Sequence, residues 1–320
     1  MTNAVKTHDL PGQAAQSILI TLNISVYTSR KKDKQTSAEV QQAKGAGSSQ
    51  AVSSYKNLFA ECAELKAIMS YAQESRNWFN RVTRVWGDNG QRQLSTASFF
   101  NDVDKELTIR AARFKLFVDA FLRIYDVQVS KQAFMLGSLF NREEFPTVEE
   151  VASKFAFRFN TEPMPLSGHF CVDAEQDAIN ELVRRYEEEM QRRVSAAQAE
   201  LFERVRKHVE HIHERMVACL AFDPDAVEET RTVDEFGVTT AIDIKKPRKP
   251  KLYDTLLDSA LEQCNLLADL NIGNDPVLES MRTKLYNAIV STDIDSLKKS
   301  PELQDSMKKK MEDILSDFDF

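Results

Sequence analysis

Three histidines within six residues form the densest cluster of side chains in this sequence that could bind a metal ion. His208, His211 and His213 lie in the segment RVRKHVEHIHERM. His208 and His211 are one helical turn apart, so both imidazoles could face one ion. Structural zinc takes four ligands, and a helix would turn His213 onto another face. We therefore expect a solvated polar face here and no metal site.

The motifs of common catalytic sites are missing from the sequence. The segment Gly45–Ser49 is followed by no lysine of a phosphate-binding loop, and there is no GxSxG, HExxH or GxGxxG. The carboxylates lie on helix faces predicted to be exposed, where nothing raises their pKa for acid catalysis. The cysteines are far apart, form no CxxC pair and are expected to be reduced: Cys62, Cys171, Cys219 and Cys264. We expect no enzymatic activity and no cofactor.

Two basic segments could bind phosphate backbones or an acidic protein face. The first follows the first predicted strand and contains Arg30, Lys31, Lys32 and Lys34. The second contains Lys245, Lys246, Arg248, Lys249 and Lys251. No aromatic residue is interleaved with either segment, which argues against a stacking platform for single strands. Such charge runs are also typical of solvated linkers, so both interpretations stay open.

The composition favours long helices. The missing signal-peptide pattern leads us to expect a cytoplasmic protein. The chain has 320 residues, of which 42% are hydrophobic and 28% charged, with only nine Gly and nine Pro. Few turn-forming residues argue against a many-stranded sandwich. The net charge of −7 gives no global attraction to nucleic acid or anionic lipid. We find no signal-peptide pattern and no apolar run of about 18 residues, and therefore expect no membrane span.

Alternating apolar residues predict several short strands. The segment 17–28, SILITLNISVYT, alternates β-branched and polar residues and predicts a half-buried strand, followed by a flexible loop up to residue 50. Asp88-Asn89-Gly90 predicts a tight hairpin between Trp86 and Leu94. Phe155, Phe157 and Phe159 predict another strand, with 169–172 as its partner, and 230–244 predicts a hairpin turning at 236–237.

Helical periodicity covers most of the rest, at 51–82, 98–128, 130–140 and 174–220. The stripe from Ile179 to Met216 takes ten steps over 37 residues, about 3.7 residues each. The stripe from Val103 to Tyr125 takes six steps over 22 residues, which is nearly the same period. The matching periods predict that these two helices pack against each other, antiparallel. After residue 252 we expect short helices with breaks at 273–276 and 300–301, and an acidic, aromatic end, DILSDFDF, that is either frayed or a partner-binding tail.

The predicted fold class is mainly α with minor β (α+β), elongated, with a long antiparallel helical pair or coiled coil and short β-hairpins at its ends. Four segments follow: an N-terminal strand with a basic loop (1–50), a long-helix body (51–222), a hairpin with a basic linker (223–251) and a short-helix region (252–320).

The order of four blocks resembles a family of uncharacterised proteins of tailed phages and proteobacteria, known as a domain of unknown function. The blocks are ILITLNISVYTSRKK, NWFNRVTRVWGDNGQRQLS, KFAFRFNTEPMPLSGHF and LYDTLLDSALEQCNLLADLNIGNDPVLESM. Genes of that family often lie beside a MoxR-type AAA+ ATPase and a CobT-like von Willebrand factor A protein. The resemblance implies an accessory role in an ATP-driven remodelling or assembly system, and it implies no residue-level roles.

Three hypotheses follow. The first is a non-enzymatic scaffold or adaptor, phage-encoded and in the host cytoplasm, that acts with the ATPase and forms homo-oligomers. The second is a nucleic-acid-associated protein that uses the basic segments 30–34 and 245–251. The third, an enzyme of unrecognised type, has the least support because no site motif was found.

Overall fold

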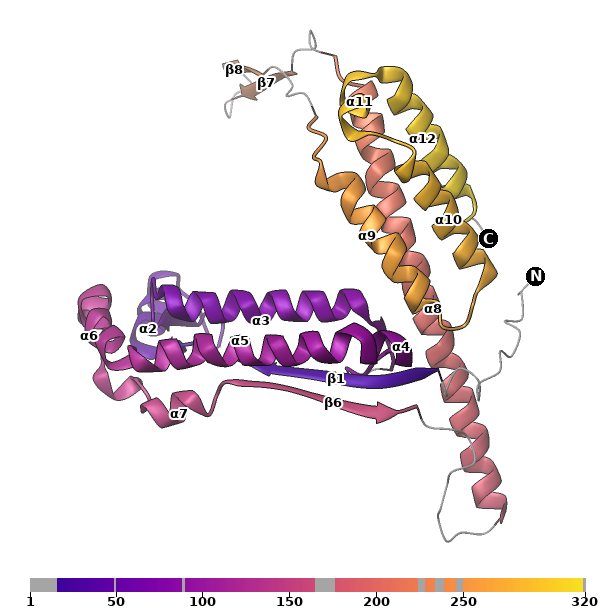
Figure 1. Cartoon of the computed structure of the whole chain (residues 1–320). Helices are drawn as coiled ribbons and strands as arrows, with labels where there is room; N and C mark the ends of the chain where they lie inside the picture. Colours follow the sequence, from indigo (N-terminus) through magenta and orange to yellow (C-terminus); the bar gives the residue numbers. More distant parts are fainter. Residues whose placement is uncertain are drawn as a thin grey trace. The chain divides into compact units, whose positions relative to one another are not determined.

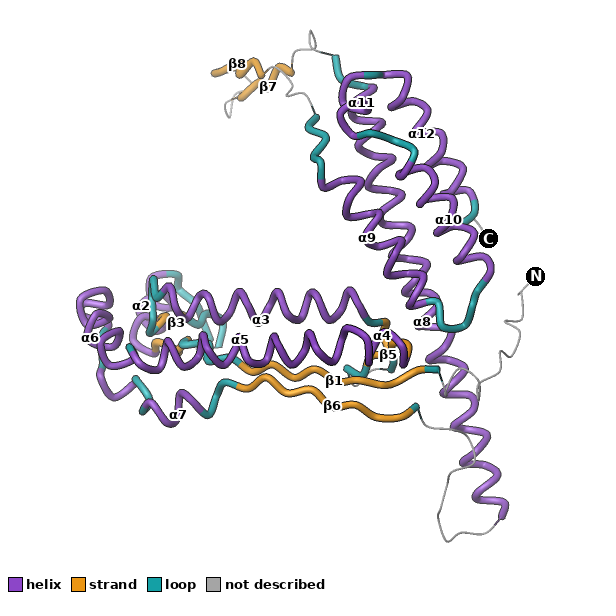
Figure 2. The backbone as a smooth tube through the Cα atoms, in the orientation of Figure 1, coloured by secondary structure: helices purple, strands orange, loops and turns teal. Residues whose placement is uncertain are grey.

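A computed structural model describes residues 16–48, 50–87, 90–164, 176–223, 228–233, 239–245 and 250–318. It divides the chain into two compact units. The mixed unit contains Ile18–Thr83 and Gly87–Met164, and the helical unit contains Met1–Ser17, Arg84–Trp86 and Pro165–Phe320. Helices predominate and the strands are few, which confirms the predicted α+β class with mainly α content (Figures 1 and 2).

The mixed unit is built on a long antiparallel strand pair. Strand β1 (Ser17–Ser25) pairs with β6 (Ala156–Pro163), with Leu22 opposite Phe159 and Ile24 opposite Phe157. In this sheet, β5 (Arg92–Ser95) pairs with β1 along the edge opposite β6. Strands β1 and β6 were predicted from their alternating residues. The partner proposed for the second one, 169–172, lies outside the described residues, and β1 takes that place.

Two amphipathic helices cover this sheet. Helix α3 (Ala63–Val82) and helix α5 (Asp104–Arg123) pack side by side, with β1 and β6 along them (Figure 1). Short elements complete the unit: α4 (Thr96–Ser98), a π-helical turn (Phe99–Val103), α6 (Tyr125–Leu136) and α7 (Val148–Ala152). The stripe predicted on 103–125 is buried except for Ala111, which is half-buried.

Aromatic rings fill the core of the mixed unit at one end. The Phe59 ring lies 5.6 Å from the Phe121 ring, 5.3 Å from Tyr125 and 6.2 Å from Tyr27, measured between centroids. Burial raises the pKa of the Tyr27 and Tyr125 hydroxyls to about 12. Edge-to-face packing of this kind adds about 0.5–1.5 kcal/mol per pair beyond the area buried.

The prediction of a flexible loop up to residue 50 is wrong. Strand β2 (Arg30–Asp33) leads directly into α2 (Lys34–Ala43), and β2 pairs with β3 (Ser54–Asn57). The Asp33 carboxylate accepts a hydrogen bond from the Thr36 amide at 2.9 Å and so caps α2. The segment is polar because both of its elements are short and lie at the surface. Residues 54–57 form β3, so the helix predicted from residue 51 begins only at Ala63.

Strands flank the predicted turn at 88–90. Strand β4 (Arg84–Val85) precedes it and β5 follows it. Gly90 has a φ of 79°, as the Asn-Gly turn requires. Asp88 and Asn89 lie outside the described residues.

The helical unit is a bundle in which successive long helices run in opposite directions (Figure 1). Its helices are α8 (Gln176–Leu220), α9 (Thr255–Leu270), α10 (Pro276–Val290), α11 (Ile294–Lys299) and α12 (Pro301–Ser316). Asp275 and Ser300 cap α10 and α12 just before a proline at the first helical position, so both predicted breaks are confirmed. The stripe on α8 is fully buried from Met190 to Met216.

The helix partners differ from those predicted. Helix α8 packs against α12, α9 and α10, whereas α5 packs against α3. The expected pairing of 103–125 with 174–220 is therefore not confirmed, because equal period shows that two helices are amphipathic without specifying which one fits the other. The predicted body 51–222 is divided between the two units, since β6 returns to β1 while α8 joins the C-terminal helices.

The helical unit also contains strand β4, an antiparallel strand pair and the C-terminal end. The Arg84 guanidinium donates to the Leu270 carbonyl at 3.3 Å, and burial lowers its pKa to about 10. Strands β7 (Glu228–Val233) and β8 (Thr239–Lys245) pair antiparallel, as predicted, and the turn predicted at 236–237 lies outside the described residues. The end up to Phe318 is not frayed, because Phe318 packs on the core and Lys284 pairs with Asp317 at 2.7 Å. None of the described helices has a stretch apolar enough to cross a bilayer.

Candidate binding surfaces

Helix α6 is apolar on two opposite faces, and only one of them is covered. Tyr125 and Val129 are buried in the core of the mixed unit. On the other side, Val127 is 71% exposed and Phe134 is 90% exposed. Met135 and Leu139 extend this patch into the following turn. We name Val127, Phe134, Met135 and Leu139 the α6 surface. The helical periodicity at 130–140 predicts a helix here, and the presence of apolar residues on both of its faces is a feature that the prediction did not include.

The first basic segment lies on an ordered strand and its helix. Arg30, Lys31 and Lys32 belong to β2, and Lys34 is the first residue of α2. All four side chains are exposed, and none makes an ion pair with another residue that the structure describes. The structure also brings an aromatic ring to this segment, because Tyr55 of β3 stands opposite Lys32. No signal in the sequence could have shown this, since the two residues are 23 positions apart.

The second basic segment is only partly described. Lys245 ends β8, and residues 246–249 lie outside the described residues. Lys251 is exposed and borders a small pocket of about 100 Å³ together with His211, Arg215 and Tyr253. Of the five cations in this segment, the structure therefore gives side-chain surroundings for Lys251 alone.

The histidines of α8 have separate surroundings. His213 Nε2 lies 3.3 Å from Glu312 of α12, and this hydrogen bond lowers the pKa of the Glu312 carboxyl. His208 is half-buried, and this burial lowers its pKa. The charge of the neighbouring His211 lowers it further, by a smaller amount. Among the described residues, no three His, Cys, Asp or Glu side chains are placed to hold one ion. His213 thus contacts α12, whereas His211 is exposed and acts on His208 through its charge.

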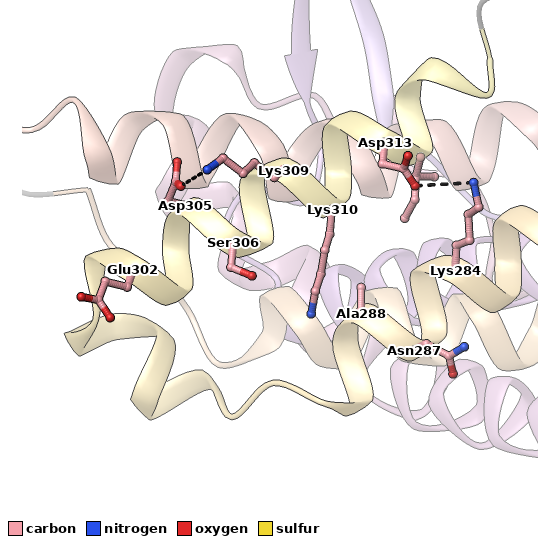
Figure 3. A pocket seen from close by; sticks show the side chains of 10 residues that line it. Lys284, Asn287, Ala288, Glu302, Asp305, Ser306, Lys309, Lys310 and Asp313 are labelled. Atoms are coloured by element: carbon pink, nitrogen blue, oxygen red, sulfur yellow. Dashed lines mark ion pairs between the residues drawn. The ribbon is translucent and has the colours of Figure 1, made fainter.

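A pocket of about 740 Å³ lies along α10 and α12 (Figure 3). Lys309 pairs with Asp305 at 2.7 Å, and Lys284 lies 3.5 Å from Asp313 and closer to Asp317. Hydrogen bonds to these carboxylates raise the pKa of both lysines. A lysine that acts as a base needs a lowered pKa, so these groups are stabilised as charges and unsuited to proton abstraction.

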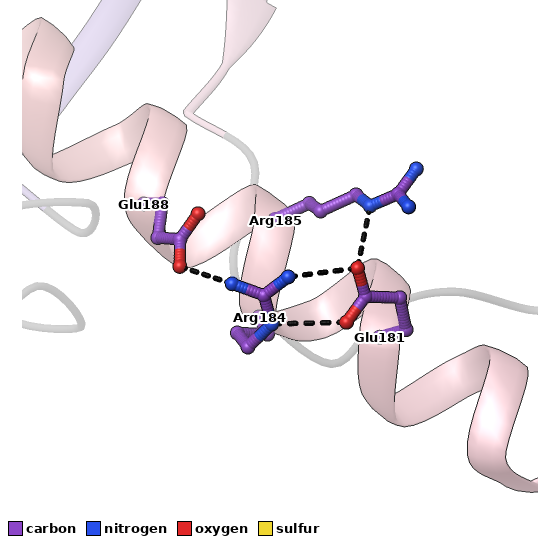
Figure 4. A network of polar contacts seen from close by, with 4 residues as sticks. All are labelled: Glu181, Arg184, Arg185 and Glu188. Carbon is purple, nitrogen blue, oxygen red and sulfur yellow. Dashed lines mark hydrogen bonds and ion pairs between the residues drawn. The ribbon is translucent and has the colours of Figure 1, made fainter.

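Two buried thiols and one carboxylate could also take part in chemistry. Their surroundings favour the protonated thiols and the ionised carboxylate. Burial raises the pKa of the Cys62 thiol, and it raises that of Cys264 to about 11, which disfavours the reactive thiolate. At the start of α8, Glu181 accepts hydrogen bonds from Arg184 and Arg185, which lower its pKa to about 2 (Figure 4). These contacts stabilise the helix and leave its carboxylate engaged.

The chain matches no protein-family model, no curated protein and no solved structure. The resemblance to the phage and proteobacterial family, and the partners that it implies, therefore stay predictions.

Proposed function

We propose that the chain is a non-enzymatic adaptor that binds another protein through the α6 surface. The observation that supports this most directly is the 90% exposure of Phe134 on a helix whose opposite face is already buried. A core contact cannot explain that residue, because its side chain contributes almost nothing to the folded unit. Large exposed aromatic side chains grouped with other apolar residues are typical of protein interfaces.

The free-energy balance explains why such a surface needs a partner. Burying one Phe or Val side chain stabilises an association by about 1.5–3 kcal/mol. This stabilisation is gained only when a partner removes the side chain from water. Two such residues one after the other along a helix face resemble the anchors of helix-mediated recognition, which recur at i and i+7. Val127 and Phe134 have this spacing, with Lys131 exposed between them.

The partner that we propose is the MoxR-type AAA+ ATPase, acting together with the von Willebrand factor A protein. This part of the proposal comes from the family resemblance alone, as do a phage origin and a place in the host cytoplasm. The proposal also includes the elongated arrangement of long helices expected from the sequence, in which α12 is the antiparallel neighbour of α8. Self-association through the α6 surface is the competing use of the same residues.

Binding to the purified ATPase tests the proposal directly. A Val127→Ser/Phe134→Ser variant is expected to lose co-elution with the ATPase, with unchanged circular dichroism. Phe100→Ser is the matched control, because Phe100 is 69% exposed in the same unit but lies away from α6 on the π-helical turn. Equal loss in both variants, or retention in both, would contradict the α6 surface. Native mass measurements distinguish a second copy of the chain from the ATPase as occupant.

A further inference from the structure

The outward face of the β2–β3 strand pair combines cations with an exposed aromatic ring. Arg30 stands opposite Asn57, and Lys32 stands opposite Tyr55. Residues opposite each other in an antiparallel pair share a face, and successive residues alternate between faces. Arg30, Lys32, Tyr55 and Asn57 therefore lie on one face, which we name the basic ladder. All four are exposed, and Tyr55 is 64% exposed.

The opposite face holds this strand pair in place. Lys56 Nζ lies 2.6 Å from a Glu144 carboxylate oxygen and donates to the Leu139 carbonyl at 2.8 Å. Ser37 Oγ donates to the Asp33 carbonyl and accepts from the Ser54 amide at 2.9 Å, so it links α2 to both strands. The basic ladder thus lies on an anchored strand pair, so little backbone entropy is left to lose on binding.

The charges of the ladder are available to a ligand. Neither Arg30 nor Lys32 makes an ion pair with any residue in the described ranges, in contrast to Lys56 on the opposite face. Along a strand, residues two apart are about 6.6 Å from each other, so the two cations form a short row beside the ring. A row of cations with an adjacent exposed ring fits a ligand with repeating negative charge and flat, unsaturated groups.

We propose that the basic ladder binds single-stranded nucleic acid, with Arg30 and Lys32 on phosphates and the Tyr55 ring stacked on a base. An unpaired strand fits better than a duplex, because bases inside a duplex are already stacked on each other and offer no free face to Tyr55. An acidic peptide would use the cations without needing the ring. This proposal is independent of the adaptor proposal, since it uses a different surface of the mixed unit.

Fluorescence anisotropy with a labelled oligothymidylate and the full chain tests it. Tyr55→Ala is expected to weaken binding about 5- to 150-fold, the range observed when one stacking side chain is removed. Tyr55→Phe keeps the ring and is expected to bind like the wild type. The Arg30→Gln/Lys32→Gln variant should reduce the slope of log affinity against log salt by about 1.4, since each phosphate contact on a single strand contributes about 0.7.

Three controls make the outcome decisive. Lys31→Gln removes the same charge from the other face of β2 and is expected to weaken binding less than either ladder substitution. A duplex of equal length should bind more weakly than the single strand and should not respond to Tyr55→Ala. Phe134→Ser, in the α6 surface, should bind the oligothymidylate normally, so failure of one proposal is distinguishable from failure of the other.

Several results would overturn the proposal. One is an unchanged affinity of Tyr55→Ala for the oligothymidylate, and another is polyglutamate that competes as well as the oligothymidylate. A third is binding that survives the ladder variants but is abolished when Lys245, Lys246, Arg248, Lys249 and Lys251 are all replaced by Gln. All substituted ladder side chains are exposed, so the variants are expected to fold, and circular dichroism checks this.

Discussion

Helices α8 and α6 bury similar apolar stripes but present different residues to water. On α8, the outer face carries glutamate–arginine pairs at i,i+4 spacing, such as Arg185 with Glu181 at 2.7 Å and Arg206 with Glu210 at 2.8 Å. On α6, the outer face carries Val127 and Phe134. Ion pairs of this kind suit a helix that faces only solvent, whereas apolar residues there suit a helix that awaits a partner.

The same contrast holds between the two units. Large apolar side chains of described residues that are more than 60% exposed all belong to the mixed unit: Tyr55, Phe100, Leu116, Val127 and Phe134. The helical unit has a larger buried cluster and carries many ion pairs, with Tyr253 (60% exposed) and Val290 (57% exposed) as its most exposed large apolar side chains among the described residues. What differs is the outer surface, since both units bury continuous cores. Binding is therefore expected to be concentrated on the mixed unit.

The largest expected effect in a test of this difference between the two units is on the rate of thiol labelling. Cys62 in the mixed unit is 1% exposed, and Cys264 in the helical unit is 0% exposed. Both are expected to react at least roughly a thousandfold more slowly in the native chain than in denaturant, because labelling requires opening of a core. Mass spectrometry of the labelled peptides follows each cysteine separately. Rapid labelling of Cys62 alone would mean that the mixed unit is loosely packed, and its exposed side chains would then not indicate a binding surface.

Two phenylalanines thirteen residues apart give the next largest effect. Phe121 is fully buried, so Phe121→Ala is expected to lower the free energy of unfolding of the mixed unit by about 3–5 kcal/mol. Phe134→Ala should change it by less than about 0.5 kcal/mol, because the side chain is already in water. Urea unfolding followed through Cys62 labelling reports on this unit alone. Equal destabilisation by both substitutions would assign Phe134 a packing role and remove the basis of the α6 surface.

The sequence predicted those features that depend on local periodicity. The stripe on 176–220 and the strands at 17–25 and 156–163 were predicted because buried positions recur at the period of the element. The breaks before α10 and α12 were predicted from Pro276 and Pro301, which fix the first helical position. These signals lie within a few residues of each other, so no knowledge of the fold is needed.

The features that were missed depend on contacts between distant segments. Strand β2 has the polar sequence RKKD, and it is ordered by β3 and by Ser37, which links both strands. Pairing of Lys32 with Tyr55, and of α8 with α12, is specified by side-chain fit over long separations. Phe134 differs, because its position opposite the buried face of α6 follows from helical geometry and could have been found in the sequence.

A smaller effect is expected on the alkaline unfolding of the mixed unit, which distinguishes it from the helical unit. The pKa of Tyr27 and Tyr125 is raised to about 12 by burial, so the mixed unit is stabilised by neutral tyrosines up to pH 10. This contribution is lost as the pH rises from 10 through 12, because the unfolded chain ionises first. The mixed unit should therefore unfold within this window, seen as cooperative tyrosinate absorbance. Tyr27→Phe is expected to move the midpoint to higher pH, and a gradual, non-cooperative titration would contradict this prediction.

The smallest expected effect concerns the charged surface of α8. The Glu181 carboxylate accepts from Arg184 and Arg185, and these bonds lower its pKa to about 2 (Figure 4). The stabilisation is present above the usual glutamate pKa and is lost as the pH falls through 2. Since water screens this pair, Glu181→Gln should slightly reduce amide protection in the first turns of α8 and leave the bundle core unchanged. Hydrogen exchange followed by mass spectrometry measures the amide protection of these turns, and Glu188→Gln is the matched variant. Loss of protection across α9 and α12 as well would mean that the charged surface supports the bundle itself, and the contrast with α6 would no longer hold.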